Sequence, residues 1–233
     1  MSEARREALW PATAEALEAE QRRIAALTFE PWSPPPRLRA AGVFVCFERT
    51  GSGPTARGWA AAAVVDELEG RTLAVGEAEG RSSAPYVPGL LALREGPLLE
   101  AAVRALRFPF DVLLVNATGR DHPRRAGLAL HLGLLLDVPT VGVTHRPLLA
   151  GGPWPGPERG ARSPLWLDGA VVGFWVRTAA GARPLAAHAG WRTDAEVAAE
   201  VLLRLSRGAR TPLPLRVARQ HAREARARVE RGG

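Results

Sequence analysis

The spacing of hydrophobic positions predicts a helix and three strands in the first third of the chain. Residues 12–27 carry apolar side chains at helical intervals, and Pro11 stands near the first turn, where proline is favoured. Three strand-like runs follow, joined by short glycine-containing connections, over residues 38–48, 59–67 and 72–80. We therefore expect an antiparallel meander after an N-terminal amphipathic helix.

The remainder of the chain changes to an alternation of helices and strands. Its pattern predicts a helix over 96–107, a buried strand over 111–115, an apolar helix over 125–137 and a strand over 140–144. Such alternation indicates parallel strand pairing. A Gly/Pro-rich loop then leads to a hairpin over 165–178 that turns at Asp168-Gly169. Thr193 and Glu196 form a candidate capping box for the next helix, and a basic helix is expected over 215–230.

Length and composition place these elements in one domain. The chain has 233 residues and a mass of 24.9 kDa, so we expect a single α/β domain over residues 1–233 with a mixed central sheet flanked by helices. No apolar run approaches the roughly 20 residues that span a bilayer, and the charged N-terminus lacks a secretory pattern. Cys46 is the single cysteine, which excludes an internal disulfide. We expect a cytoplasmic monomer without a membrane partner.

The charge of the chain points to nucleic acid as a partner. The formal net charge is +7, and all 31 basic residues are arginine. A GC-rich genome explains the use of arginine over lysine, but it does not explain the positive excess. Guanidinium groups bind phosphate oxygens bidentately, so a basic chain of this kind is a candidate for binding nucleic acid.

The stretch "APYVPGLLALREGPLLEA" at residues 84–101 resembles the endonuclease V family, whose motif reads Pro-Tyr-[Ile/Val]-Pro-Gly-x-Leu-x-x-Arg-Glu. The resemblance continues through "HPRRAGLALHLGLLLDVPTVGVT" and covers most of residues 38–195. It implies a ribonuclease H-like fold and Mg²⁺ as cofactor. It also implies cleavage of the second phosphodiester 3′ to a deoxyinosine, in DNA in preference to RNA.

The resemblance also implies roles for individual residues. Tyr86 stands in a turn stiffened by Pro85 and Pro88, where the family has a wedge that enters the duplex. The alternative is that the tyrosine ring packs on the sheet. Small or apolar residues are expected to shape a pocket for the extruded base: Gly89, Leu91, Gly119 and Gly127. A second group is expected near the phosphate or the metal: His122, Arg124 and His131.

Two positions depart from the family pattern where it supplies metal ligands. Asn116 follows the strand over 111–115, where the family has a metal-binding aspartate, and Phe44 stands where the first strand of the family carries another. Glu95 and Asp194 remain as expected metal-binding and catalytic carboxylates, and His145 replaces a catalytic lysine. Asp121 is a candidate substitute ligand; its alternative is a solvated carboxylate paired with Arg120 or Arg124.

Mg²⁺ requires anionic oxygen ligands in near-octahedral geometry, so these two substitutions disfavour cleavage. Loss of one supporting residue typically costs roughly 10–100-fold, and two losses that act independently should cost about 10²–10⁴-fold. Three functions therefore stay open. The chain is a nucleic-acid-binding protein with impaired cleavage, a working deoxyinosine endonuclease with an altered metal site, or a structural or protein-interaction module that uses its basic C-terminal helix.

Overall fold

The structure is a computed structural model that describes residues 10–49, 53 and 55–232. Its centre is one eight-stranded sheet with the strand order β3-β2-β1-β4-β5-β8-β7-β6. The strands are β1 (Arg39–Phe47), β2 (Arg57–Asp66), β3 (Thr72–Arg81), β4 (Val112–Val115), β5 (Thr140–Thr144), β6 (Arg162–Leu167), β7 (Ala170–Val176) and β8 (Leu185–Ala189). β1, β4 and β5 are parallel, whereas the remaining pairs are antiparallel.

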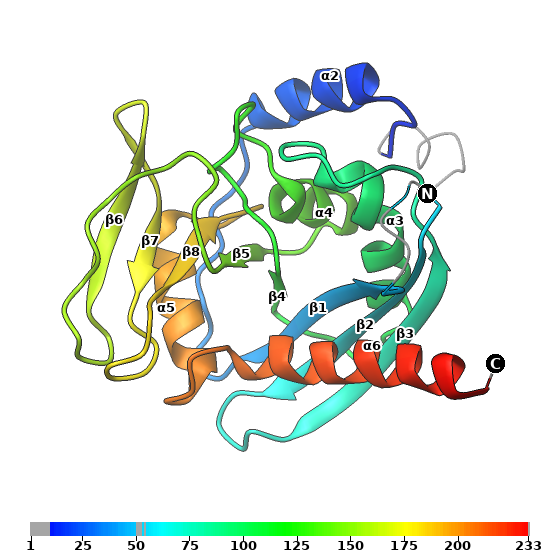
Figure 1. Cartoon of the computed structure of the whole chain (residues 1–233). Coiled ribbons are helices and arrows are strands. Elements are labelled where there is room, and N and C mark those ends of the chain that lie inside the picture. The colour runs from blue at the N-terminus through cyan, green and yellow to red at the C-terminus, as the bar shows by residue number, and fades with distance from the viewer. Residues whose placement is uncertain (1–9, 50–52, 54, 233) are drawn as a thin grey trace.

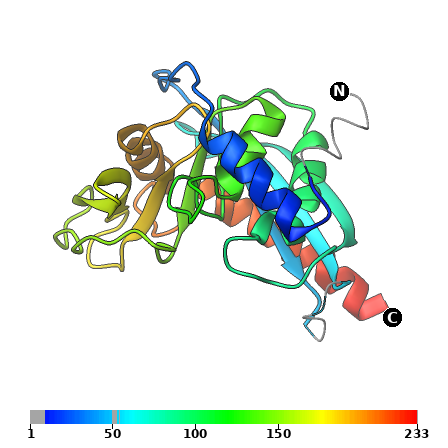
Figure 2. The same ribbon diagram turned by 90° about the horizontal axis from the view of Figure 1, so that it is seen from above.

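Helices cover both faces of this sheet (Figures 1 and 2). The helices are α2 (Ala14–Ala25), α3 (Leu91–Arg104), α4 (Leu128–Leu136), α5 (Ala195–Ser206) and α6 (Leu213–Gly232). α6 runs across β1 and β2, and α5 packs on β5, β7 and β8. α3 packs on β1, β2 and β3, and α4 on β4 and β5. The predicted mixed sheet flanked by helices is confirmed.

Strand alternation explains how β4 contributes to the two largest hydrophobic cores. Val112 and Leu114 of β4 pack in one cluster with α5 and Leu215 of α6, whereas Leu113 and Val115 pack in the other with α3 and α4. Successive side chains of a strand point to opposite faces, so a buried strand must be apolar at every position. β4 therefore sits between both cores, and Asn116 directly follows its last residue.

Two elements differ from the sequence prediction. α3 begins at Leu91, earlier than expected, and contains Pro97. Proline lacks the N–H that would bond the carbonyl of Leu93, and the hydroxyl of Ser83 donates to that carbonyl instead, at 2.6 Å. β8 was not predicted, because its small residues "LAAHA" carry no alternating pattern. In the structure β8 joins the β6–β7 hairpin to β5.

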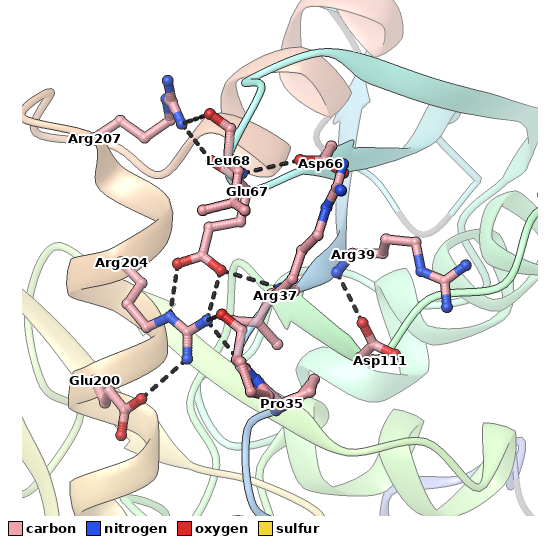
Figure 3. A network of polar contacts seen from close by, with 12 residues as sticks. Pro35, Arg37, Arg39, Asp66, Glu67, Leu68, Asp111, Glu200, Arg204 and Arg207 are labelled. Atoms are coloured by element: carbon pink, nitrogen blue, oxygen red, sulfur yellow. Dashed lines mark hydrogen bonds and ion pairs between the residues drawn. The ribbon is translucent and has the colours of Figure 1, made fainter.

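A network of charged side chains ties α5 to the β2–β3 turn (Figure 3). Glu67 accepts hydrogen bonds from Nε and Nη2 of Arg204, each at 2.6 Å, and from the backbone N–H of Leu38 at 3.1 Å. Burial alone would raise the pKa of the Glu67 carboxyl, but these bonds hold that pKa below its ordinary value. No helix that the described residues form is long and apolar enough to cross a membrane.

Candidate nucleic-acid interface

A cavity of about 470 Å³ opens beside the end of β4. Its volume lies within the range of small-molecule sites. α3 contributes Glu95 to its lining, and the segment after β4 contributes Asn116. The other lining residues come mainly from the loops before α3, after β4 and after β5: Gln21, Tyr86, Pro88, Gly89, Leu91, Ala92, Ala117, Thr118, His122, Leu128, Thr144, His145, Arg146, Pro147 and Leu148.

The loop before α3 is held in place through the carbonyl oxygen of Gly89. That oxygen accepts hydrogen bonds from Gln21 Nε2 at 3.2 Å, His122 Nε2 at 3.0 Å and Arg124 Nη2 at 2.8 Å. Gly89 has a φ of +80°, a backbone conformation that favours glycine. The three donors come from α2 and from the loop after β4. The turn that carries Tyr86 is therefore anchored to the body of the protein at its C-terminal side.

His122 donates from Nε2 because its Nδ1 accepts the backbone N–H of Arg124, at 3.2 Å. This pair of bonds selects the neutral Nε2–H tautomer. Burial lowers the pKa of His122 to about 4, although its bond to Gly89 works in the opposite direction. The ring is thus a neutral support for the loop at physiological pH.

The tip of the same loop is open to solvent. The side chain of Tyr86 is 64% exposed and that of Val87 40% exposed, whereas Gly89 is buried. Pro85 and Pro88 flank the tip and are exposed as well. Tyr86 therefore does not pack on the sheet, which removes the alternative role. An exposed aromatic ring on an anchored, proline-stiffened turn stands at the rim of the cavity.

Among the described residues that line the cavity, Glu95 is the one acidic side chain. It is partly buried and forms no hydrogen bond or ion pair with the described part of the chain. Burial raises the pKa of its carboxyl to about 7, against a smaller opposing effect of Arg94. Near neutral pH this carboxyl is therefore about half protonated.

Phe44 lines a second cavity of about 220 Å³ that adjoins the first. The two cavities share Asn116, Thr144 and His145. Phe44 faces α6, because the guanidinium carbon of Arg219 lies 5.9 Å from the centre of its ring. The remaining lining residues are Val143, Leu185, Thr211, Leu215 and Arg223.

The residues around these cavities do not fit a magnesium ion. Glu95 offers one carboxylate, Asn116 offers a neutral oxygen, and Phe44 offers no ligand atom. Between residues 10 and 232, wherever the structure describes the chain, no three His, Cys, Asp or Glu side chains are grouped so that they could hold a metal ion. The donor set is therefore too poor in anionic oxygen for this hard cation.

Asp121 does not supply the missing ligand. Its side chain is 0% exposed and accepts the backbone N–H groups of Leu148, Leu149 and Ala150, at 2.6, 2.9 and 2.8 Å. The nearest ring nitrogen of His188 lies 3.7 Å away. The expectation of a solvated carboxylate paired with Arg120 or Arg124 was wrong as well. Asp121 instead fixes the 148–150 segment, whose first residue lines the large cavity.

Several residues expected at the nucleic-acid interface have internal roles instead. His131 is 0% exposed, and its ring stacks on Trp10 with centroids 4.5 Å apart. Arg124 donates hydrogen bonds to the carbonyl of Gly89 and to Gln21 Oε1, the latter at 2.6 Å, and forms an ion pair with Glu18 at 3.3 Å. A Cβ on Gly119 would lie 1.9 Å from the carbonyl oxygen of Ala189, and one on Gly127 would lie 2.3 Å from that of Thr118. Both glycines permit close backbone packing, and neither lines the cavity.

Asp194 also lies outside the cavity lining. It is the N-cap of α5, where its Oδ1 accepts the backbone N–H of Val197 at 2.8 Å. Thr193, which was expected to be that cap, donates its hydroxyl to the carbonyl of Thr140 at 2.7 Å. The structure therefore brings Glu95, Asn116 and His145 together but does not bring Asp194 to them.

The sequence did not single out Arg219 and Arg223, although both line the second cavity. The basic C-terminal helix was predicted, and residues four apart share a helix face. That face could not be placed against β1 without the tertiary structure. Gln21 was missed for the same reason, because it reaches the cavity from α2.

Comparison with known proteins gives consistent matches. A family model for Endonuclease V matches residues 28–220. The chain is 44% identical to Endonuclease V of Methanopyrus kandleri over 171 residues, 73% of this chain and 74% of that protein.

The fold is similar to that of solved structures. The crystal structure of Endonuclease V from Streptomyces avermitilis matches with a TM-score of 0.85 at 37% identity, over 95% of this chain and 96% of that chain. Ciona intestinalis Endonuclease V, in complex with a 24mer DNA containing an inosine followed by a ribo-adenosine, matches with a TM-score of 0.74 at 20% identity, over 92% of this chain and 98% of that chain. The predicted ribonuclease H-like fold is confirmed.

Proposed function

Because this chain belongs to the Endonuclease V family, we propose that it binds nucleic acid at deaminated bases and has an impaired capacity to cleave the strand. The observation that carries this proposal is the contrast between two parts of one site. The anchored Tyr86 turn and the adjoining cavity are intact, whereas two metal-ligand positions hold Asn116 and Phe44.

The geometry around Tyr86 supports recognition of an extruded base. An aromatic ring inserted at a base step holds the duplex open, and the extruded base needs a pocket close by. Tyr86 supplies the exposed ring, and the cavity of about 470 Å³ lies next to it. The hydrogen bonds from Gln21, His122 and Arg124 to the carbonyl of Gly89 hold the turn that carries the ring beside the cavity. In the Ciona intestinalis structure, the relative is bound to DNA that contains inosine.

The same geometry supports poor cleavage. A divalent ion assists hydrolysis of a phosphodiester by orienting water, lowering its pKa and neutralising charge on the phosphate. Glu95 is the one carboxylate that the described residues offer to the large cavity, and its pKa of about 7 keeps it half neutral at that pH. We propose that magnesium is held too weakly here to support rapid nicking.

A second candidate is a working deoxyinosine endonuclease, and the state of Glu95 is the observation in its favour. A general base is most effective when its pKa lies near the working pH, and the pKa of Glu95 is raised to about 7. The two candidate functions differ in the expected rate of strand cleavage and not in the expected binding of inosine-containing nucleic acid.

Gel shift and nicking assays on one inosine-containing duplex, in Mg²⁺ and in Mn²⁺, test both candidates. An undamaged duplex and an RNA duplex with inosine serve as parallel substrates, since the preference for DNA is part of the proposal. We expect the wild-type protein to shift the inosine DNA preferentially. We expect the double variant Phe44→Asp/Asn116→Asp to nick it at least about 10²-fold faster than wild type.

Phe44→Asn is the matched control, because it removes the ring without adding a charge. It should not raise nicking above the wild-type rate. Rapid Mg²⁺-dependent nicking by the wild-type protein would contradict impaired cleavage and favour the second candidate. A double variant that binds inosine DNA but stays inert would show that the missing carboxylates are not the cause.

A further inference from the structure

The smaller cavity, beside Phe44, has a strongly positive lining. Its lining residues include Arg219 and Arg223, and none of those in the described part of the chain is acidic. Burial and the neighbouring charges of Arg210 and Arg219 lower the pKa of His145, which favours its neutral form. Asn116 and Thr211 add neutral polar groups, whereas Val143, Leu185 and Leu215 form apolar walls. Cationic groups placed against apolar walls, with no carboxylate near them, attract an anion.

The two arginines of this cavity differ from others on the same helix. Arg226 donates to the carbonyl of Phe47 and lies near Glu230, and Arg228 pairs with Glu77 at 2.7 Å. Arg219 and Arg223, by contrast, have no carboxylate within ion-pair distance among the described residues. Burial lowers the pKa of Arg219, and the neighbouring charges of Arg223 and Arg216 lower it further. Like charges are thus crowded here, and the neighbouring Glu224 accepts a hydrogen bond from Gln220 and forms no ion pair with Arg219 or Arg223 in the described part of the chain.

We propose that Arg219 and Arg223 form a binding site for a phosphate group, in which guanidinium charge stands where a metal ion would otherwise neutralise the nucleic-acid backbone. The nucleic-acid ligand rests on the proposed function, whereas the binding of a phosphate group is testable without it. Asn116 and His145 contribute to the linings of both cavities, so a phosphate held here lies directly beside the base cavity.

Guanidinium groups suit this role because their N–H donors match the oxygens of a phosphate in a bidentate geometry. Arg219 is held over the ring of Phe44, which orients it toward β1 without consuming its donors. Phe44 therefore has a positive function in this site: it supports the arginine that replaces a metal.

The use of arginine in place of a metal ion separates phosphate binding from strand cleavage. An arginine can neutralise a phosphate, but it cannot bind a water molecule and lower its pKa as a metal ion does. A site of this kind keeps the affinity for the backbone and loses the means of generating hydroxide. The lack of carboxylates near the phosphate favours such binding further, since each carboxylate would repel the backbone.

Inorganic phosphate provides the first test, with the arginine Nε–H resonances of the full chain followed by NMR. The test variant is Arg219→Gln/Arg223→Gln. The matched control is Arg107→Gln/Arg231→Gln, which removes the same charge from two exposed arginines that do not line the cavity. Arg231 lies on the same helix, about 18 Å along its axis from Arg219. We expect saturable shifts of the Arg219 and Arg223 resonances in wild type and in the control.

Binding to the inosine duplex, measured by fluorescence anisotropy at several salt concentrations, provides the second test. We expect the test variant to lose about 10–100-fold in affinity, as for loss of charge-assisted hydrogen bonds. The slope of log K against log salt should fall by about 0.9, the value for one phosphate contact. The control should retain its affinity within a few fold. Circular dichroism on each variant verifies folding.

Two results would overturn the proposal. Phosphate could leave the Arg219 and Arg223 resonances unchanged in the wild-type protein, or the test and control variants could lose equal affinity. A different result would overturn only the proposed function: the wild-type protein would show the phosphate-dependent shifts and yet bind inosine and undamaged duplexes equally.

Discussion

Glu95 carries a pH dependence that follows from its surroundings. Burial raises the pKa of its carboxyl from 4.5 to about 7, so the folded protein binds a proton more tightly than the unfolded chain does. Below pH 4.5 this raised pKa contributes its full stabilisation, which is then lost as the pH rises through about 7. Above that pH the fold contains a poorly solvated carboxylate with no partner among the described residues.

Replacement of Glu95 by glutamine should therefore raise the free energy of unfolding above pH 7 and leave it unchanged below pH 4.5. Each pKa unit corresponds to about 1.4 kcal/mol, and partial exposure reduces the gain to about 1–2 kcal/mol. Urea denaturation of both proteins across this pH range measures the difference. A loss of stability in Glu95→Gln at high pH would show that the carboxylate has a favourable partner.

Arg124 is expected to act through the Tyr86 turn and not through phosphate. Replacement by methionine removes its bonds to Gly89 and Gln21, and loss of charged, partly buried hydrogen bonds costs about 1.5–3 kcal/mol. Thermal denaturation should show this loss, and the preference for inosine DNA should fall with it. Arg22→Met is the control, because Arg22 makes an exposed pair with Glu18 whose loss costs at most about 1 kcal/mol. Equal effects of the two variants would exclude the anchoring role.

At the scale of elements, the 148–150 segment depends on Asp121. An asparagine at this position keeps one acceptor oxygen and turns an N–H₂ group toward backbone donors, so at least one of the three bonds is lost. We expect Asp121→Asn to lower the free energy of unfolding by about 2–3 kcal/mol.

Asp168→Asn in the β6–β7 turn is the control. The Asp168 side chain is 80% exposed in its ion pair with Arg125, so this change should lower the free energy of unfolding by less than about 1 kcal/mol. Chemical denaturation compares the two. A negligible cost at position 121 would leave Asp121 free to act elsewhere.

The elements with a strong pattern were predictable. The Asp168-Gly169 hairpin has both residues at positive φ, as a tight two-residue turn requires, and the alternation around β4 and β5 produced the expected parallel pairs. β8 was not predicted because its run of small residues carries no alternating pattern, and alanine favours a helix over a strand. The start of α3 was missed because the apolar spacing indicated a helix only from residue 96. The helix continues through Pro97 because Ser83 bonds the carbonyl that the proline leaves without its N–H partner.

At the scale of the whole molecule, the local motifs named several residues that the structure brings to one cavity. Tyr86, Pro88, Gly89, Glu95 and Asn116 do meet at one cavity, because they lie on or beside adjacent elements. Long-range packing decided the rest. The stacking of His131 on Trp10 and the packing of α6 on β1, which brings Arg219 beside Phe44, depend on contacts between distant parts of the sequence.

The overall charge acquires a specific meaning from this arrangement. The net charge of +7 is spread over the chain, but the unpaired arginines beside Phe44 concentrate positive potential where the site lacks carboxylates. A divalent cation is disfavoured there by repulsion as well as by the lack of anionic oxygen. The same field favours the phosphate backbone. On the proposed account, the same two arginines both disfavour a metal ion and favour the phosphate backbone.

Isothermal titration of the purified wild-type protein with Mn²⁺, above pH 7 where Glu95 is mainly ionised, tests this account most directly. Mn²⁺ prefers the same oxygen ligands as Mg²⁺ and needs no nucleic acid for the measurement. We expect no saturable binding by the wild-type protein and clear one-site binding by Phe44→Asp/Asn116→Asp. Saturable binding of one ion by the wild-type protein, abolished in Glu95→Gln, would contradict the account.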